Sequence, residues 1–232
     1  MLHATVIGGL LAAIFGFGAS GVAAQSQATS VTANPIVPSV PRPIDGIAAR
    51  IEDDIITESD VRELGAFQQL VNGSARSREE IIRELADQWV VRQEASTTNY
   101  KQPPEEEVES AYEQFVKKFP SPAVFQSRIA AVGLSESAVR RLLEQQLYLS
   151  RFLEYRFRPA AQIDPKQIET YYQEEFVPQL KKRGAEVPPL DDVEDTIREV
   201  LVQRAINDRA NKWLEDMRGR IKIDIVPEGA GP

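Results

Sequence analysis

Acidic side chains are the most abundant ionisable groups in this chain, and two short runs of them could hold a cation. Residues 52–54 read Glu-Asp-Asp, and carboxylate oxygens are the ligands that hard cations prefer. The same run fits a solvated turn between two short strands, which is the commoner structure for such a sequence. Residues 191–195 form a second acidic group at an expected helix start, where the helix dipole favours negative charge. We therefore predict no metal site.

Histidine and cysteine, which carry much of enzymatic chemistry, are nearly absent. The 232 residues include no cysteine and a single histidine, His3, which lies in a segment that we expect to be removed as a secretion signal. This excludes disulfides, cysteine nucleophiles, histidine-based triads and histidine or thiolate metal sites from the mature chain. No phosphate-binding glycine loop or nucleophile elbow occurs either. We predict that the protein is not an enzyme, has no catalytic residues and binds no cofactor.

Aromatic side chains provide a different kind of candidate, a binding surface. A helix is expected from Ser135 to about Arg158, and at 100° per residue Tyr148, Phe152 and Tyr155 point to one side of it. Aliphatic and aromatic residues occupy the opposite side: Val139, Leu142, Leu143, Leu149, Leu153 and Phe157.

A helix that is apolar on two sides has two explanations. It is either the central helix of a bundle, which is the commoner case, or it is packed on one side and lines an open groove on the other. In the second case Tyr148, Phe152 and Tyr155 would contact an extended unfolded chain. Tyr171 and Tyr172 could extend the same groove or could equally pack between helices. Aromatic rings suit such a groove because they offer large, rigid and amphipathic contact area.

The stretch from Ile44 to Val61 is expected to organise the elements that position these residues. Two β-prone runs, 47–51 and 55–57, flank the acidic turn, and Thr57 with Asp60 forms a helix N-cap signal. A two-stranded hairpin is marginal alone and needs a third strand. The alternating run 221–226 is the only other convincing strand, so we predict a small sheet that joins both ends of the domain.

Helical periodicity and capping residues fill the interval between these strands. Helices are expected over about 58–72, 77–97, 104–119, 122–132, 135–158, 165–177 and 191–218, with Pro178 ending the sixth. The predicted fold class is therefore mainly α, with about seven helices and a small β element. The domain extends over residues 44–226 and is followed by a flexible tail, 227–232.

The segment before the domain reads as a targeting signal and a linker. Residues 1–24 contain no Lys, Arg, Asp or Glu, and an apolar run, 6–19, is followed by Val-Ala-Ala before Gln25, which fits a cleaved signal peptide for export to the periplasm. An N-terminal anchor in the inner membrane is the alternative, although the run of about 14 residues is short of the ~20 that span a bilayer. Residues 25–43 are rich in Pro, Ser and Thr and are expected to form a disordered leader.

The order of apolar run, acidic turn, Ile-Ile-Thr-Glu-Ser-Asp-Val and capped helix resembles the start of the SurA-type periplasmic chaperones and their PpiC-related cousins. The resemblance extends to about Tyr172 and resumes at about Val187. It implies a helical core that holds unfolded outer-membrane proteins, closed by the last helix and strand. In this family a parvulin prolyl isomerase module is inserted before the closing helix. Here that interval, 177–189, is too short for a folded module.

These observations predict an ATP-independent holdase chaperone that binds unfolded envelope or outer-membrane proteins and assists their assembly. The expected partners are unfolded or extended polypeptides, with weak self-association left open. Nucleic acid is not expected, because the net charge is −8 and no basic stripe occurs. Two alternatives remain: a prolyl isomerase, active or classed as one through its relatives, and a non-catalytic scaffold subunit of the envelope.

Overall fold

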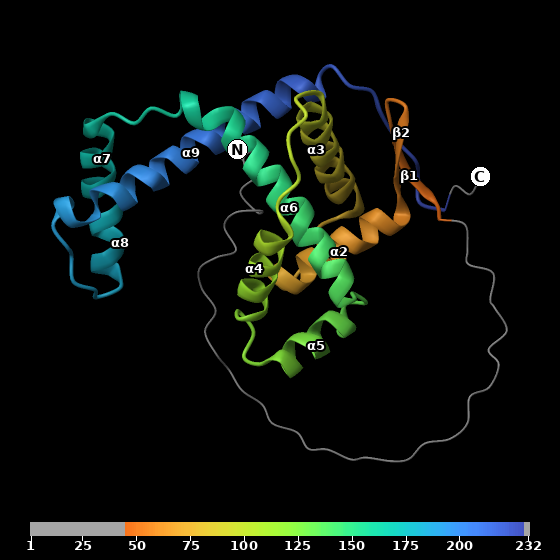
Figure 1. The fold of residues 1–232 in the computed structure, drawn as a ribbon, viewed down its shortest axis with the longest axis horizontal. Coiled ribbons are helices and arrows are strands. Elements are labelled where there is room, and N and C mark those ends of the chain that lie inside the picture. Colours follow the sequence, from red (N-terminus) through yellow and green to blue (C-terminus); the bar gives the residue numbers. More distant parts are fainter. Residues whose placement is uncertain (1–44, 230–232) are drawn as a thin grey trace, which may run out of the picture.

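The computed structural model describes residues 45–229, a mainly helical body with a small three-stranded sheet, as the sequence predicts (Figure 1). The predicted signal 1–24, the predicted leader 25–43 and the end of the predicted tail, 230–232, lie outside the described residues. The elements, in chain order, are β1 (Ile47–Ile51), β2 (Asp54–Thr57), α2 (Glu58–Asn72), α3 (Arg78–Thr97), α4 (Glu105–Val116), α5 (Pro122–Ala131), α6 (Glu136–Phe157), the 3₁₀ turn η1 (Arg158–Ala160), α7 (Pro165–Tyr171), the π-helical turn η2 (Tyr172–Phe176), α8 (Val177–Lys182), α9 (Leu190–Arg218) and β3 (Ile223–Ile225).

The sheet joins the two ends of the described chain. Its strand order is β2-β1-β3 with both pairs antiparallel, so that Ala49 of β1 faces Ile56 on one side and Ile225 on the other. Two hydrogen bonds join the turn after β1 to the residue before β3. The Glu52 N–H donates to the Lys222 carbonyl at 3.1 Å, and the Lys222 N–H donates to Glu52 Oε1 at 2.7 Å. The predicted pairing of hairpin and C-terminal strand is confirmed.

Capping residues fix the helix starts that the sequence indicates. The Thr57 hydroxyl accepts from the Asp60 N–H while the Asp60 carboxylate accepts from the Thr57 N–H, and Ser77 and Glu80 form the same reciprocal pair at the start of α3. Each pair satisfies two backbone donors that a helix start leaves without partners. Gly73 ends α2 in the left-handed conformation, with φ of 75°.

Several helix boundaries differ from the prediction; α4, for example, ends at Val116, three residues before the expected end at 119. Pro178 does not end its helix, because the backbone widens into the π turn η2, in which the Val177 N–H donates to the Tyr172 carbonyl. Pro178 thereby lies in the first turn of α8 and does not interrupt the helical segment. The segments α7, η2 and α8 are thus continuous. The last helix starts one residue early, at Leu190, with Pro189 and no side-chain cap before it.

Helix α6 is the central helix of the body and contributes to two of the hydrophobic clusters (Figure 1). Its N-terminal half packs with α2, α4 and α5, and its C-terminal half packs with α3 and α9. The first cluster comprises Phe67, Leu70, Tyr112, Phe115, Phe125, Ile129, Leu134, Ala138, Val139 and Leu142; the second comprises Val90, Val91, Ala95, Tyr148, Leu149, Phe152, Leu153, Ala210 and Leu214. A third cluster joins the sheet to α2 and α3.

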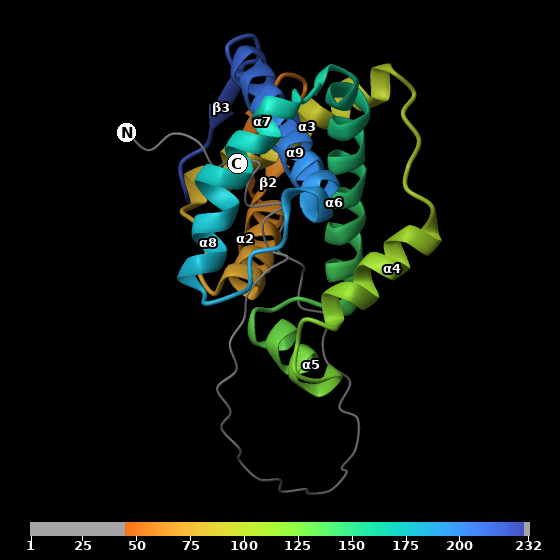
Figure 2. The same cartoon turned by 90° about the vertical axis from the view of Figure 1, so that its left-hand side faces the viewer.

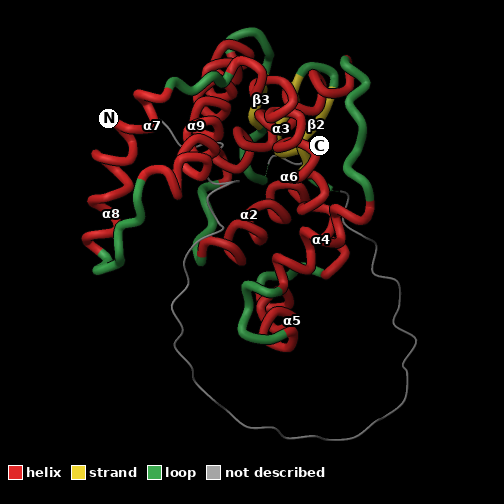
Figure 3. The backbone as a smooth tube through the Cα atoms, turned by 60° about the vertical axis from the view of Figure 1, so that its left-hand side comes forward, coloured by secondary structure: helices red, strands yellow, loops and turns green. Residues whose placement is uncertain are grey.

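The continuous segment from α7 to α8 forms an arm that lies beside α9. Figures 1 and 3 show this arm at the end of the molecule away from the sheet, and Figure 2 shows it in front of the body, with α7 above α8. The buried Ile168 of α7 and Ile197 of α9 anchor the arm. None of the described helices is both long and apolar enough to cross a membrane.

One ion pair ties the end of α9 to α3. Arg218 donates from Nε and Nη2 to the two carboxylate oxygens of Asp87, at 2.7 and 2.5 Å. Asp87 is only 4% exposed, and its burial raises the pKa of the carboxyl against the opposing effect of Arg218. This pair holds the chain in place immediately before β3.

Replacing Arg218 by methionine is expected to lower the free energy of unfolding by about 3–5 kcal/mol, because it leaves the buried Asp87 carboxylate without its partner. The double variant Asp87→Leu with Arg218→Met removes both charges and should recover most of that loss. Urea unfolding measures both values. Arg220→Met, at an exposed neighbouring position, is the matched control. An Arg218→Met variant as stable as this control would contradict the structural role of the pair.

Candidate binding site

The aromatic side of α6 is covered, so it forms no open groove. Tyr100, in the loop after α3, places its ring against Tyr148, Phe152 and Tyr155, with ring centroids 5.8, 5.4 and 5.3 Å apart. Phe152 is completely buried and Tyr148 is 7% exposed, whereas Tyr155 is 64% exposed. The expected groove face is therefore corrected: Tyr148 and Phe152 belong to the core, which matches the alternative of a central helix.

Tyr171 and Tyr172 lie in the arm and not with the α6 aromatics. The Arg204 guanidinium stacks over the Tyr171 ring at 4.7 Å, and the Tyr172 hydroxyl donates to the Pro188 carbonyl at 2.7 Å. The Tyr172 ring also stacks on Phe176. Both tyrosines thus hold the arm together, and the expectation that they extend the α6 aromatic face is wrong.

Two of the acidic residues 52–54 have structural roles as well. Glu52 accepts from the backbone of Lys222, and Asp54 Oδ2 accepts from Trp89 Nε1 at 2.7 Å. Within residues 45–229, no group of three or more acidic or histidine side chains is placed to hold a metal ion. The structure therefore favours the turn interpretation of this run.

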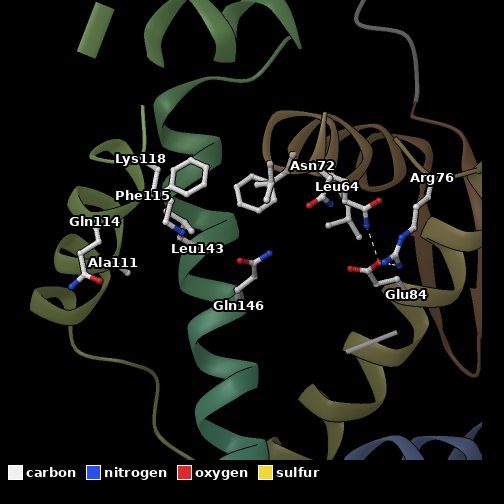
Figure 4. A pocket seen from close by; sticks show the side chains of 13 residues that line it. Leu64, Asn72, Arg76, Glu84, Ala111, Gln114, Phe115, Lys118, Leu143 and Gln146 are labelled. Atoms are coloured by element: carbon white, nitrogen blue, oxygen red, sulfur yellow. Dashed lines mark hydrogen bonds and ion pairs between the residues drawn. The ribbon is translucent and has the colours of Figure 1, made fainter. Parts of the chain in front are cut away.

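An open cleft between α2, α4 and α6 is the strongest candidate for a binding site (Figure 4). It has a volume of about 230 Å³. Apolar side chains form most of its walls: Leu64, Phe67, Val71, Ala111, Phe115 and Leu143. Polar side chains complete the lining: Gln68, Asn72, Arg76, Glu84, Gln114, Lys118 and Gln146.

The elements that form the cleft explain why it stays open. Phe67 and Phe115 stack with ring centroids 5.6 Å apart and join α2 to α4 on the core side. Further out, the facing positions carry a small residue, Ala111, and the half-buried Leu143, which leave space between the helices. Figure 4 shows Gln146 extending from α6 into the space between Phe115 and Glu84.

One wall of the cleft is a buried polar network. Gln68 Nε2 donates to Glu84 Oε2 at 2.8 Å, and Arg76 Nη1 donates to the same oxygen at 2.9 Å. Glu84 is 5% exposed, and its burial raises the pKa of the carboxyl, while Arg76 and Gln68 oppose that rise. Buried charge is costly unless it is paired. The network therefore places a partly compensated carboxylate beside an apolar cavity.

Two further hollows have different linings. One, of about 500 Å³, lies beside β2 and carries both acidic and basic residues, including Asp60 and Arg141. The other, of about 490 Å³, lies where α7 meets α9. Neither combines stacked aromatic rings with a buried polar network.

Two acidic residues of α3 provide a sequence signal for the cleft that helical periodicity alone does not reveal. Glu84 and Asp87 lie three residues apart in α3, and each is about one turn from a buried apolar residue, Ile81 before Glu84 and Val90 after Asp87. Such residues are buried only with partners. Their spacing could have indicated buried ion pairs, although the identity of the partners depends on the fold.

Comparison with known proteins yields no relative: no protein-family model and no curated protein matches the chain.

Substitution of Phe152 by alanine is expected to lower the free energy of unfolding by about 3–5 kcal/mol, because a fully buried ring is replaced by a cavity. The matched substitution Tyr155→Ala, at the exposed end of the same aromatic group, should cost about 0.5 kcal/mol. Urea unfolding distinguishes the two. Equally small losses would show that the aromatic side of α6 is open after all.

The raised pKa of Glu84 predicts a pH dependence of stability. The folded protein holds this proton more tightly than the unfolded chain, so the stabilising effect is complete below the ordinary pKa of 4.5 and is lost as the pH rises through the folded pKa. Glu84→Gln removes this loss. The variant should therefore gain stability relative to wild type as the pH rises from 4.5 towards neutrality.

Urea unfolding of both proteins across this pH range measures the difference. Glu79→Gln, an exposed change on the same helix, controls for the removal of one negative charge. A difference between Glu84→Gln and wild type that does not change with pH would contradict the assignment.

Proposed function

We propose that this protein is an ATP-independent holdase chaperone of the periplasm that binds unfolded segments of envelope or outer-membrane proteins. The observation that carries the proposal is the α2/α4/α6 cleft, where apolar walls and amide-bearing side chains meet at an open surface. The binding site is thus placed between these helices and not on the aromatic side of α6.

The lining of the cleft suits a client of variable sequence. Phe67 and Phe115 offer rigid apolar area that accepts different side chains. Asn72, Gln114 and Gln146 carry amides, which both donate and accept hydrogen bonds and so match the peptide backbone. Apolar contact of this kind holds an unfolded segment by removing its apolar surface from water, without any need for nucleotide.

The resemblance of the opening hairpin and capped helix to SurA-type chaperones supports the same proposal. The short connection between α8 and α9, residues 183–189, leaves no room for an inserted isomerase module. We therefore place the activity in the helical body itself. The acidic net charge of −8 would keep complexes with apolar clients soluble.

An aggregation assay with an unfolded outer-membrane β-barrel protein tests the proposal. Wild type in several-fold excess is expected to suppress light scattering. Ala111→Phe places a ring in the cleft without opening a cavity in the core, and it should weaken client binding about tenfold or more, equivalent to a loss of at least ~1.4 kcal/mol. Ala131→Phe makes the same change at an exposed position of α5 and should leave suppression intact.

The possible outcomes separate the site from the function. If wild type suppresses no aggregation, the chaperone proposal is wrong. If Ala111→Phe suppresses as well as wild type, the cleft is not the site. Co-purification of one stoichiometric folded partner, without suppression, would favour a scaffold subunit, and proline-peptide isomerisation well above background would favour an isomerase.

A further inference from the structure

The side chain of Gln68 is held in one orientation by its neighbours. Its Nε2 donates to Glu84 Oε2, which also accepts from Arg76. An ionised carboxylate only accepts hydrogen bonds, so Gln68 must present its NH₂ group to Glu84 and turn its carbonyl oxygen the other way. The bond to Glu84 thus fixes the direction of Gln68 Oε1.

That carbonyl oxygen has no hydrogen-bond partner within the described chain. Gln68 is 7% exposed, and its Oε1 atom is buried among residues that line the cleft. Buried polar side-chain atoms nearly always have a partner, and an acceptor without one is energetically costly. A ligand donor that reaches this atom, which exposes less than 1 Å² of surface, would remove this cost.

The chemistry around Gln68 selects among possible donors. Glu84 is paired with Arg76, so Lys118 leaves the ionised side chains of the cleft with a net positive charge, which disfavours a cationic donor such as a lysine or arginine side chain. A neutral N–H remains, and an extended polypeptide presents one backbone N–H to the same side at every second residue. The side chain next to that N–H could enter the apolar part of the cleft, between Phe115 and Leu143.

We propose that Gln68 Oε1 accepts a backbone N–H of the bound segment, so that the cleft recognises the main chain of an extended client. This inference rests on the proposed chaperone function and adds the mode of recognition to it. The affinity then comes from one backbone hydrogen bond, which every residue except proline can donate, and from the burial of one apolar side chain. Clients of unrelated sequence bind in the same way, and a proline at the bonded position is excluded.

A peptide whose backbone amides are methylated one at a time tests this mode. The probe is a short fluorescein-labelled peptide of alternating leucine and serine, and binding is measured by fluorescence anisotropy. With wild type, methylation at one position should weaken binding by about tenfold, because it removes the N–H that Gln68 accepts. Methylation at the other positions should have a smaller effect.

The variant Gln68→Met keeps the length of the side chain and removes the acceptor. It should bind the unmodified peptide about tenfold more weakly than wild type and should lose the sensitivity to methylation at that position. Gln69→Met, an exposed change at the next position of α2, should behave as wild type. Circular dichroism of each variant shows whether it is folded. If Gln68→Met does not fold, the methylation series on wild type still tests the proposal.

The results separate this inference from the proposed function. If the peptide binds and aggregation is suppressed, but no position is sensitive to methylation, main-chain recognition is wrong and the chaperone proposal stands. Sensitivity that persists in Gln68→Met overturns the role of Gln68. If wild type binds no peptide and suppresses no aggregation, both are wrong.

Discussion

The burial of α6 is the constraint on which the rest of the structure depends. This helix is apolar along its whole length, and each half must be covered by different helices. Helices α2, α4 and α5 cover the first half, and α3 and α9 cover the second. The cleft lies on the first half, where the coverage by α2 and α4 is incomplete around Gln146 (Figure 4). The proposed binding site is therefore a part of the core that the surrounding helices do not fully cover.

The interior also contains charge, and the two buried acidic groups of α3 differ in what surrounds them. Asp87 receives two bonds from one arginine, which is the arrangement that best compensates a buried carboxylate. Glu84 shares a single oxygen between Arg76 and Gln68, and beside it Gln68 Oε1 has no partner within the described chain. Asp87 thus stabilises the fold, whereas the network around Glu84 leaves a hydrogen-bond acceptor, Gln68 Oε1, at the cleft without a partner in the described chain. A fold selected for stability alone would favour apolar residues there.

Local signals predicted most of the secondary structure, because caps and strand alternation act over a few residues. Thr57 with Asp60, and Ser77 with Glu80, mark helix starts correctly, and the sheet follows from the need of a hairpin for a third strand. The site could not be predicted in this way. Periodicity gives the side of α6 on which Phe152 lies, but not that Tyr100 covers it. Likewise, the partner of Asp87 lies 131 residues away in the sequence.

The position of β1 at the centre of the sheet has a consequence for how the protein is made. Its partner β3 follows the entire helical body, so the two strands that meet at Ala49 and Ile225 are synthesised at opposite ends of the domain. A chain that grows from its N-terminus cannot complete this sheet, or pair Asp87, until α9 and β3 have been synthesised. Closing so long a loop is entropically costly and slows folding. Until α9 has been synthesised, the nascent chain therefore exposes the part of α6 that α9 covers, and the growing domain itself needs protection from aggregation.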